Sequence, residues 1–267
     1  MRGENRSGPG AAGARSPGGG VVTEIVGRGT AEARWQQWGA LGTLPVVTPD
    51  DLGRDLLVVA PHPDDEVLGA GGLLALAGGE VVAVTDGEAS HPQSDTVDRA
   101  RLVAARRAET AAALGLLGRG ATPVHRLAHP DGAVQEDRLA DQLTALLSRP
   151  APTGARDWTC VATWRGDGHP DHEAVGRAAA RACGHTGARL VEYPVWMWHW
   201  AAPGDDRVPW DRAVALPLPR VIRDRKRGAT AAFVSQVRPL GPAPADAAVL
   251  PPHVLDRFDR DQEVFFT

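Results

Sequence analysis

The chain has 267 residues, of which 43% are hydrophobic, and its formal net charge is −4. This length permits one large domain whose core needs no disulfide bonds. The negative charge argues against a nucleic-acid partner, and no apolar run reaches the ~20 residues of a membrane span. Cys160 and Cys183 lie in apolar segments without a CxxC motif, which predicts buried thiols in a reducing compartment. Because no apolar stretch follows Arg2 and Arg6, we expect no signal peptide and a cytoplasmic protein.

The first residues differ in composition from the rest of the chain. Residues 1–20 are mainly Gly, Pro, Ala, Ser and Arg, with almost nothing to bury, which predicts a disordered tail. Residues 21–267 are expected to form a single domain. Near its start, Trp35 and Trp38 fall three residues apart on a helix predicted over residues 30–41, so their indoles would pack on the main body.

An apolar run followed by a polar cluster is the most informative stretch of the sequence. Leu56–Ala60 is rich in Val and Leu, which predicts a strand buried on both faces. The next six residues read Pro-His-Pro-Asp-Asp-Glu. Because proline cannot extend a hydrogen-bonded ladder, this cluster must lie in the loop beyond the strand. In an open α/β sheet, ligands bind in the crevice beyond the carboxyl ends of the strands.

A helix containing three glycines is predicted directly after this loop, over Val67–Ala77. Each of Gly69, Gly71 and Gly72 weakens a helix by about 1 kcal/mol relative to Ala. We therefore expect the helix to approach the sheet or a ligand closely. The glycine spacing, and the acidic cluster at the turn, do not fit a dinucleotide site of the G-x-G-x-x-G type.

Strand-like and helix-like segments alternate through the following hundred residues. This alternation predicts a Rossmann-like α/β fold, in which a mostly parallel sheet carries helices on both faces. The predicted strands are Glu80–Thr85, Pro123–Leu127, Trp158–Thr163 and Leu190–Tyr193. The predicted helices are Thr96–Leu117, Gln135–Leu147, an Ala-rich helix ending near Ala182, and a basic helix over Ile222–Ser235. Val264–Phe266 is expected to be an edge strand.

Two segments of the last third allow more than one interpretation. Trp196, Trp198 and Trp200 alternate along a predicted extended segment, so they would share one face. They would either stack on a sugar or apolar aglycone, or pack against the sheet; His199 would point the other way and line the pocket. The basic helix would either attract an anionic substrate or be solvated. Its basic residues are Arg223, Arg225, Lys226 and Arg227.

A second polar motif, His-Pro-Asp-His at residues 169–172, follows the strand predicted at 158–163. Two His and one carboxylate are a common ligand set for a metal with an open coordination position. His62 and Asp65 are close enough along a tight loop to bind one ion, and His172 could supply the third ligand across the crevice. The sequence therefore predicts a divalent-metal site.

The remaining polar groups of the two motifs indicate a hydrolase. Asp64, next to a ligand, is free to act as general base on a water molecule that the metal makes more acidic. His169 can face the same pocket, stabilise an oxyanion or protonate a leaving group, and Asp171 would orient it. The arrangement is typical of a hydrolase, in which either Asp64 or His169 would protonate the leaving group.

The motif pair resembles the PIG-L/LmbE-like family of zinc-dependent N-acetylglucosaminyl de-N-acetylases, over residues 35–266. The resemblance implies the same assignment: metal ligands His62, Asp65 and His172, catalytic base Asp64, and His169 with Asp171 as the second catalytic pair. It implies Zn²⁺ as the cofactor, with another divalent metal such as Fe²⁺ as an alternative. The expected partner is a small N-acylated amino sugar or glycoconjugate; the oligomeric state is not predicted.

The resemblance also supplies candidates for substrate binding. An R-x-x-E pair matches Arg106 and Glu109, and a P-D-G turn matches residues 130–132. In sugar-cleaving relatives the Arg and this Asp hold glucosamine hydroxyls, so Arg106 and Asp131 become sugar-binding candidates. The alternative interpretation is that Arg106 lies on the surface of its helix and that Asp131 belongs to an ordinary turn. Glu88 and His91, on the loop after the strand at 80–85, are further candidates for the pocket wall.

One position departs from part of the family. Members of the mycothiol pathway carry a tyrosine two residues before the first His of the second motif, whereas this chain has Asp167 there, and its only tyrosine is Tyr193. A mycothiol-type substrate is therefore not expected. Three alternatives remain: hydrolysis of another amide on a non-sugar substrate, a non-haem iron oxidoreductase with two His and one carboxylate, or a non-catalytic metal-binding module.

Overall fold

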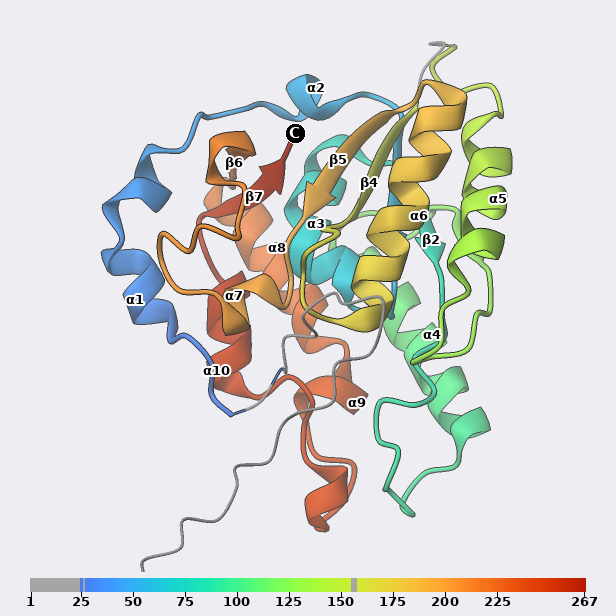
Figure 1. The fold of residues 1–267 in the computed structure, drawn as a ribbon. Helices are drawn as coiled ribbons and strands as arrows, with labels where there is room; N and C mark the ends of the chain where they lie inside the picture. The colour runs from blue at the N-terminus through green and yellow to red at the C-terminus, as the bar shows by residue number, and fades with distance from the viewer. Residues whose placement is uncertain (1–24, 26, 155–157) are drawn as a thin grey trace, which may run out of the picture.

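The computed structural model describes residue 25, residues 27–154 and residues 158–267. The tail predicted for residues 1–20 lies outside the described residues. Within them, one sheet has the strand order β3-β2-β1-β4-β5-β7-β6 (Figure 1). The strands are β1 Leu56–Ala60, β2 Glu80–Ala83, β3 Val124–Arg126, β4 Thr159–Thr163, β5 Arg189–Tyr193, β6 Ala213–Pro217 and β7 Gln262–Phe266.

The sheet is mostly parallel, as predicted. Strands β1 to β5 pair in parallel, and β7 pairs antiparallel with both β5 and β6. The expectation that residues 264–266 form an edge strand is wrong. Strand β6, which was not predicted from the sequence, covers the outer side of β7 and places β7 inside the sheet.

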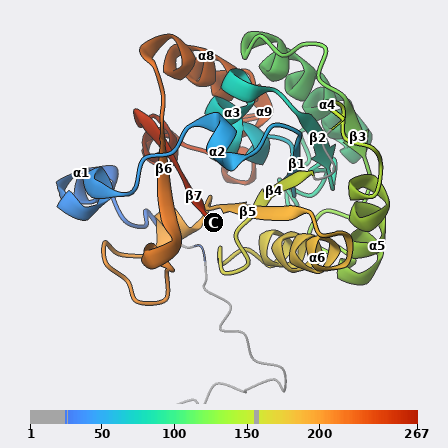
Figure 2. The same ribbon diagram turned by 90° about the horizontal axis from the view of Figure 1, so that it is seen from above.

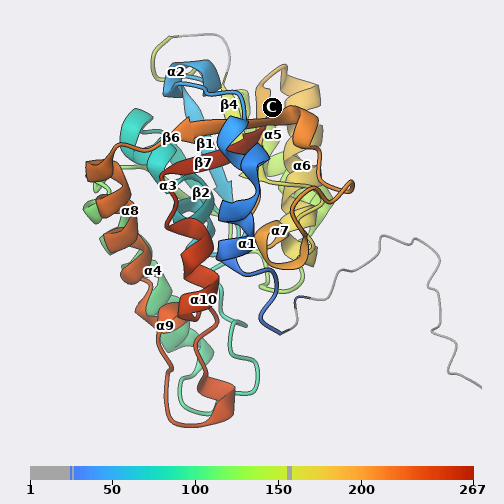
Figure 3. The same ribbon diagram turned by 90° about the vertical axis from the view of Figure 1, so that its left-hand side faces the viewer.

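Helices cover both faces of the sheet, as predicted. Figure 2 shows α3, α4 and α8 on one face and α5 and α6 on the other. The side view separates the same two layers, with α4 and α8 on one flank and α6 on the other (Figure 3). The helices are α1 Glu32–Gln37, α2 Pro49–Leu52, α3 Asp65–Ala77, α4 Arg99–Leu116, α5 Glu136–Leu147, α6 Pro170–Thr186, α7 Met197–Trp200, α8 Arg220–Ala231, α9 Val234–Val237 and α10 Pro252–Leu255.

Short 3₁₀ turns connect some of these elements. They lie at Gly39–Thr43, Trp210–Arg212, Pro244–Asp246 and Asp256–Phe258. No helix of the described residues combines the length and apolarity that crossing a membrane requires.

The two helical layers explain why β1 is apolar throughout. Leu56 and Val58 pack into the core that includes α3 and α8, whereas Leu57 and Val59 pack into the core formed with α5 and α6. Alternating side chains of one strand thus enter different cores, and neither face can be polar. Cys160 and Cys183 are buried free cysteines, as predicted.

Helix α3 approaches the sheet closely, which explains its glycines. A Cβ on Gly69 would lie 2.0 Å from Cδ2 of Tyr193, and a Cβ on Gly72 would lie 2.4 Å from Leu218. The helix is also kinked at Ala70, where φ is −137° and ψ is 16°. The prediction of a closely approaching helix is confirmed, and its cause is contact with the sheet and with neighbouring side chains.

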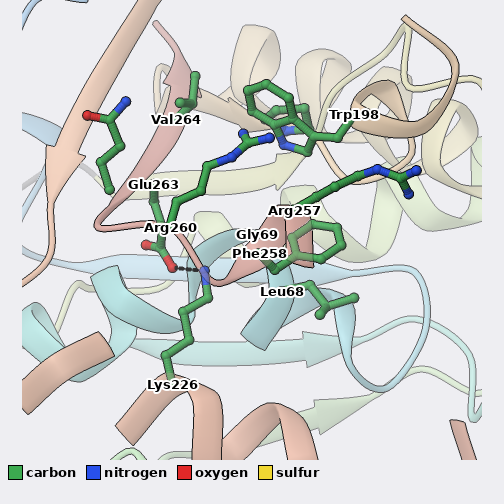
Figure 4. A pocket seen from close by; sticks show the side chains of 11 residues that line it. Leu68, Gly69, Trp198, Lys226, Arg257, Phe258, Arg260, Glu263 and Val264 are labelled. Carbon is green, nitrogen blue, oxygen red and sulfur yellow. Dashed lines mark hydrogen bonds and ion pairs between the residues drawn. The ribbon is translucent and has the colours of Figure 1, made fainter. Parts of the chain in front are cut away.

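A carboxylate from β7 stabilises the second half of α3. Glu263 accepts the N–H groups of Gly72 at 2.6 Å and Leu73 at 2.9 Å, just after the kink. Lys226 of α8 donates to the same carboxylate at 2.7 Å, and both side chains are almost fully buried. Figure 4 shows this pair beside a small cavity of about 20 Å³.

The aromatic segment is not extended, because residues 197–200 form the short helix α7. Trp196, Trp198 and Trp200 therefore do not share one face. Trp198 packs edge-on against the buried Trp35, with 5.0 Å between ring centroids, and Arg260 lies 3.9 Å above its ring. Packing is thus the role of Trp198, and Trp35 packs on the main body as predicted.

The basic helix is ion-paired on one side. Arg223 and Arg227 of α8 both contact Asp259, and Lys226 is buried against Glu263. Acidic partners already neutralise these three cations, so they are not available to attract an anionic substrate. This weakens the first of the two interpretations of the helix.

Candidate metal centre and active site

The two sequence motifs meet at one edge of the sheet. Strands β1 and β4 are parallel neighbours, so the loops that follow them leave the sheet side by side. The first loop carries His62 to Asp65, and the second carries His169 to His172 at the start of α6. The topology thus brings together residues more than one hundred positions apart.

The three predicted metal ligands form a compact triangle of donor atoms. His62 Nδ1 lies 3.3 Å from Asp65 Oδ2 and 3.3 Å from His172 Nε2, and the last two atoms lie 3.2 Å apart. Ligands about 2.0–2.1 Å from a tetrahedral zinc ion are about 3.3 Å from one another, so the triangle matches zinc coordination. Nitrogen and oxygen donors of this kind also accept other divalent metals.

The electrostatics of the triangle favour a cation. Burial opposes a charge on His172, yet Asp65 and Asp167 raise its pKa to about 9. Burial would raise the pKa of Asp65, but His172 and His62 outweigh it and hold the pKa below its usual value. The site therefore attracts positive charge, which a divalent ion would supply.

Both imidazoles are oriented by carboxylates on their other nitrogen. His172 Nδ1 lies 2.8 Å from Asp167 Oδ2, and His62 Nε2 lies 3.2 Å from both Asp131 Oδ1 and Asp171 Oδ2. Ionised carboxylates only accept hydrogen bonds, so the facing ring nitrogens carry the protons. His62 Nδ1 and His172 Nε2 are then the ring nitrogens that face the triangle, and they would bind a metal in their deprotonated form.

Asp64, the predicted base, lies beside the triangle at the start of α3. Its φ is +136°, a conformation that non-glycine residues rarely adopt, and its N–H donates to Glu66 Oε2 at 3.0 Å. Burial raises the pKa of Asp64 to about 8; the Arg106 charge opposes this, and Asp65 and Glu66 add to it. A carboxyl group with this pKa is mostly protonated at neutral pH, and a cation in the neighbouring triangle would lower the pKa toward the range of a general base.

Arg106 donates hydrogen bonds to the loop that carries Asp64. It is 2% exposed and donates to Gly87 O at 2.9 Å, Pro63 O at 2.6 Å and Asp64 Oδ2 at 3.1 Å. The guanidinium borders the cavity, and these protein acceptors engage its two terminal nitrogens. The interpretation as an ordinary surface arginine is wrong. The contacts give Arg106 a role in positioning Asp64, while its buried Nε has no hydrogen-bond partner among the described residues, and sugar binding stays a prediction.

Glu109, the partner of Arg106 in the R-x-x-E pair, contacts a different element. Its carboxylate accepts the N–H of Ser235 at 2.7 Å and the hydroxyl of Ser235 at 2.8 Å. It thereby fixes the start of α9, whose Gln236 lines the cavity. The two residues of the pair thus hold two different parts of the cavity wall.

Asp131 points at a metal ligand rather than into open space. Its Oδ1 faces His62 Nε2, and its Oδ2 accepts the N–H of Ala89 at 2.7 Å. Glu88 Oε1 accepts the N–H of Asp131 at 3.1 Å and so supports this turn. Asp131 borders the cavity, and each of its carboxylate oxygens has one protein partner, so its predicted hold on sugar hydroxyls stays a prediction.

Glu88 and His91 do not line the described cavity wall, contrary to expectation. Burial lowers the pKa of His91, whose Nε2 lies 3.2 Å from Ala247 O and whose Nδ1 lies 3.0 Å from Ser90 Oγ. Ala89, Ser90 and Pro92 from the same loop face the cavity instead. His199 is absent from the described wall as well, and lies 3.3 Å from Arg257.

His169 lies in the cavity wall, but Asp171 does not orient it with its carboxylate. The backbone N–H of Asp171 donates to His169 Nδ1 at 3.2 Å, which leaves the ring proton on Nε2. The Asp171 carboxylate instead contacts His62 and accepts the N–H of Gly132 at 2.8 Å. Burial, and then His172 and His62, lower the pKa of His169 to about 3, so its imidazole is neutral.

One cavity of about 350 Å³ collects these groups. Its polar wall comes from the two motifs, and its remaining wall includes apolar side chains from distant segments. Five of the lining residues come from the last third of the chain: Val195, Trp196, Gln236, Val249 and Leu250. Of these, only Trp196 was suggested for the site from the sequence. No local motif marks these residues, because the fold brings them to the cavity.

The sequence and the fold were compared with known proteins. Residues 57–183 match the model of the PIG-L family, described as GlcNAc-PI de-N-acetylase. This confirms the resemblance drawn from the two motifs and supports a de-N-acetylase. No curated protein matches the sequence.

Three solved structures illustrate the fold relationship. The conserved protein TT1542 from Thermus thermophilus is 26% identical, with a TM-score of 0.54, over 80% of this chain and 94% of that chain. The N,N'-diacetylchitobiose deacetylase from Pyrococcus horikoshii is 18% identical, with a TM-score of 0.54, over 79% and 82%. A zinc-inhibited form of teicoplanin deacetylase is 19% identical, with a TM-score of 0.52, over 79% and 97%. At 18% and 19% identity, the last two similarities show a shared fold alone.

Proposed function

We propose, because residues 57–183 match the model of the PIG-L family, that this chain is a metal-dependent de-N-acetylase. It would act as an amidohydrolase on linear amides, removing an N-acetyl or other N-acyl group from an N-acetylglucosamine-containing small molecule or glycoconjugate. The observation that carries the proposal is the donor triangle of His62, Asp65 and His172, with Asp64 beside it in the wall of one cavity.

The three metal ligands and the base have separate roles in the proposed reaction. A divalent ion held by His62, Asp65 and His172 would polarise the amide carbonyl and make a water molecule more acidic. Asp64 accepts the proton of that water, and Arg106 keeps the carboxylate in place through its 3.1 Å hydrogen bond.

His169 supplies the second catalytic group. Its Nδ1 is engaged by a backbone N–H, so its Nε2–H is the ring donor available to the oxygen of the amide as that oxygen gains negative charge. A neutral imidazole has only this one ring proton, and that proton forms the hydrogen bond to the oxyanion. We therefore assign Asp64, once protonated, to deliver the proton to the departing amine.

Three observations support an amino-sugar substrate. The family model that matches the chain is described by an N-acetylglucosamine-containing lipid, and one structural neighbour is named for N,N'-diacetylchitobiose. The cavity of about 350 Å³ lies within the range typical of small-ligand pockets. Its wall combines polar groups at the catalytic end with apolar groups such as Leu68 and Leu250, which suits a sugar attached to an apolar group.

The test is acetate release from a panel of N-acetylglucosamine conjugates by protein loaded with Zn²⁺, Co²⁺ or Fe²⁺. Several metals are needed because a neighbouring deacetylase is known in a zinc-inhibited form. We expect acetate release that the Asp64→Asn variant loses while it still binds metal. Near-normal deacetylation by that variant would refute the assignment of the base.

Other outcomes would identify the alternatives. Activity on other amides without activity on amino sugars would overturn the sugar assignment and leave the metal site standing. Oxygen consumption with Fe²⁺ but no acetate release would identify the iron oxidoreductase, and metal binding without either reaction would identify a binding module. A cytoplasmic location and one domain over residues 21–267 remain proposals to be tested alongside.

A further inference from the structure

The Asp167 carboxylate accepts four hydrogen bonds although its side chain is fully buried. Its Oδ2 lies 2.8 Å from Nδ1 of His172 and accepts the N–H of Trp196 at 2.9 Å. Its Oδ1 accepts the N–H groups of Val195 at 2.8 Å and Met197 at 3.0 Å. One side chain therefore contacts both a ring of the candidate metal centre and the backbone that leads into α7.

The contact with His172 fixes which ring nitrogen can bind a metal. Because the carboxylate is an acceptor, Nδ1 of His172 carries a proton, and Nε2 is the ring nitrogen left to bind a metal. This Nε2 lies 3.2 Å from Asp65 Oδ2 and 3.3 Å from His62 Nδ1. Carboxylates in this position orient a ligating histidine and strengthen it as a ligand.

The contacts with residues 195–197 fix part of the substrate cavity. Val195 and Trp196 line that cavity, and their N–H groups have the Asp167 carboxylate as their acceptor. The Trp200 indole also donates to Asp167 O at 2.8 Å, so α7 is attached to this residue at both ends. This part of the wall lies 28 to 30 positions after Asp167 in the sequence, so the carboxylate joins two separate segments.

We propose that Asp167 is a positioning residue that couples metal occupancy to the order of the cavity wall at residues 195–197. The proposal rests on the proposed function, because the ion must bind His172. An ion on Nε2 holds the His172 ring, the ring holds the carboxylate, and the carboxylate holds three backbone N–H groups. Coupling of this kind is reciprocal, so an ordered wall also strengthens metal binding.

The Asp167→Asn variant removes one acceptor without changing the size of the side chain. If the amide oxygen faces Val195 and Met197, its NH₂ group faces His172 Nδ1. That nitrogen must then accept, which moves the His172 proton to Nε2 and blocks the metal position. The opposite amide orientation directs the NH₂ group at the N–H groups of Val195 and Met197 and loosens the wall.

The first experiment uses the unsubstituted full chain and needs no variant. Hydrogen exchange of the amides of residues 195–197 is compared with and without saturating Co²⁺. We expect Co²⁺ to slow exchange there and to leave the amides of α9 unchanged, since α9 borders the cavity but is attached through Glu109. Equal exchange with and without the metal, in protein shown to bind it, would overturn the coupling.

The second experiment measures Co²⁺ affinity by equilibrium dialysis. We expect Asp167→Asn to weaken it about 10–100-fold, and to raise KM through faster exchange at residues 195–197. Trp196→Phe should raise KM and leave Co²⁺ affinity unchanged. Asp205→Asn, which removes a carboxylate paired with Arg207 in the loop after α7, is the matched control and should change neither.

The outcomes separate this proposal from the proposed function. Wild-type Co²⁺ affinity in Asp167→Asn would refute the link to the metal centre. Weakened affinity with unchanged exchange at residues 195–197 would refute the link to the wall. Failure of the unsubstituted protein to bind any divalent metal would refute the proposed function itself, and the coupling with it. Metal binding and coupling without acetate release would refute the deacetylase assignment and leave the coupling intact.

Discussion

Arg106 donates to Asp64 from a side chain that is almost completely excluded from solvent. The same guanidinium holds Pro63 O and Gly87 O, so it joins the loop after β1 to the loop after β2. A lysine has one ammonium group in place of the planar fork and cannot reach these acceptors in the same geometry. The position of the proposed base thus depends on a residue of α4.

The Arg106→Lys variant tests this dependence. We expect kcat to fall about 10–100-fold, because small displacements of a catalytic group have effects of that size. Metal affinity should remain, since Arg106 contacts none of the three ligands. Arg101→Lys, on an exposed part of α4, is the control. An unchanged kcat in Arg106→Lys would show that Asp64 is held by other groups.

Metal binding should stabilise the fold, because the donor triangle joins loops from two strands. At a metal concentration of 100 times Kd the expected gain is about 2.7 kcal/mol. For a domain of this size that raises Tm by roughly 5–11 °C. His172→Ala should abolish the metal-dependent increase in thermal scans with and without a chelator. An equal increase in that variant would place the metal elsewhere.

Loss of Lys226 should destabilise the protein strongly. Lys226→Met leaves the buried Glu263 charge without its partner, which costs about 3–5 kcal/mol in comparable buried pairs. Arg227→Met, one position along α8, removes a half-exposed pair with Asp259 and should cost less than about 1 kcal/mol. Urea denaturation compares the two. Similar midpoints would mean that water or another group compensates Glu263.

Gly69→Ala tests the close approach of α3 to the sheet. The added Cβ would overlap the Tyr193 ring at 2.0 Å, and overpacking of this kind costs about 1–3 kcal/mol. Gly115 lies in α4 with no atom within 4 Å of an added Cβ, so Gly115→Ala should stabilise the chain by about 0.5–1 kcal/mol. A neutral Gly69→Ala would show that the Tyr193 ring moves without cost.

The sequence was sufficient to predict the parallel strands and the placement of both motifs beyond their ends. Apolar runs such as Leu56–Ala60 mark strands buried on both faces, and proline marks where they end. Parallel strands then bring His62 and His172 to one edge, so the donor triangle follows from topology. These features depend on local patterns, which is why they could be predicted.

Contacts between distant segments could not be predicted. The segment of Trp196, Trp198 and Trp200 was expected to be extended, but residues 197–200 form α7, and the Asp167 carboxylate accepts the N–H groups of residues 195–197 at its start. Asp171 was assigned to its sequence neighbour His169, whereas its carboxylate faces His62. A polar residue in a loop indicates a polar partner, but only the folded chain identifies which one.

The contact of Glu263 with the second half of α3 also has a consequence for biosynthesis. Glu263 follows Gly72 by 191 residues, so the ribosome adds it roughly 10–40 s later at usual elongation rates. During that interval the N–H groups after the kink lack their carboxylate, and β7 has not yet entered the sheet between β5 and β6. The helix that begins at the proposed metal ligand Asp65 therefore reaches its final geometry only late in translation, after most of the chain has emerged.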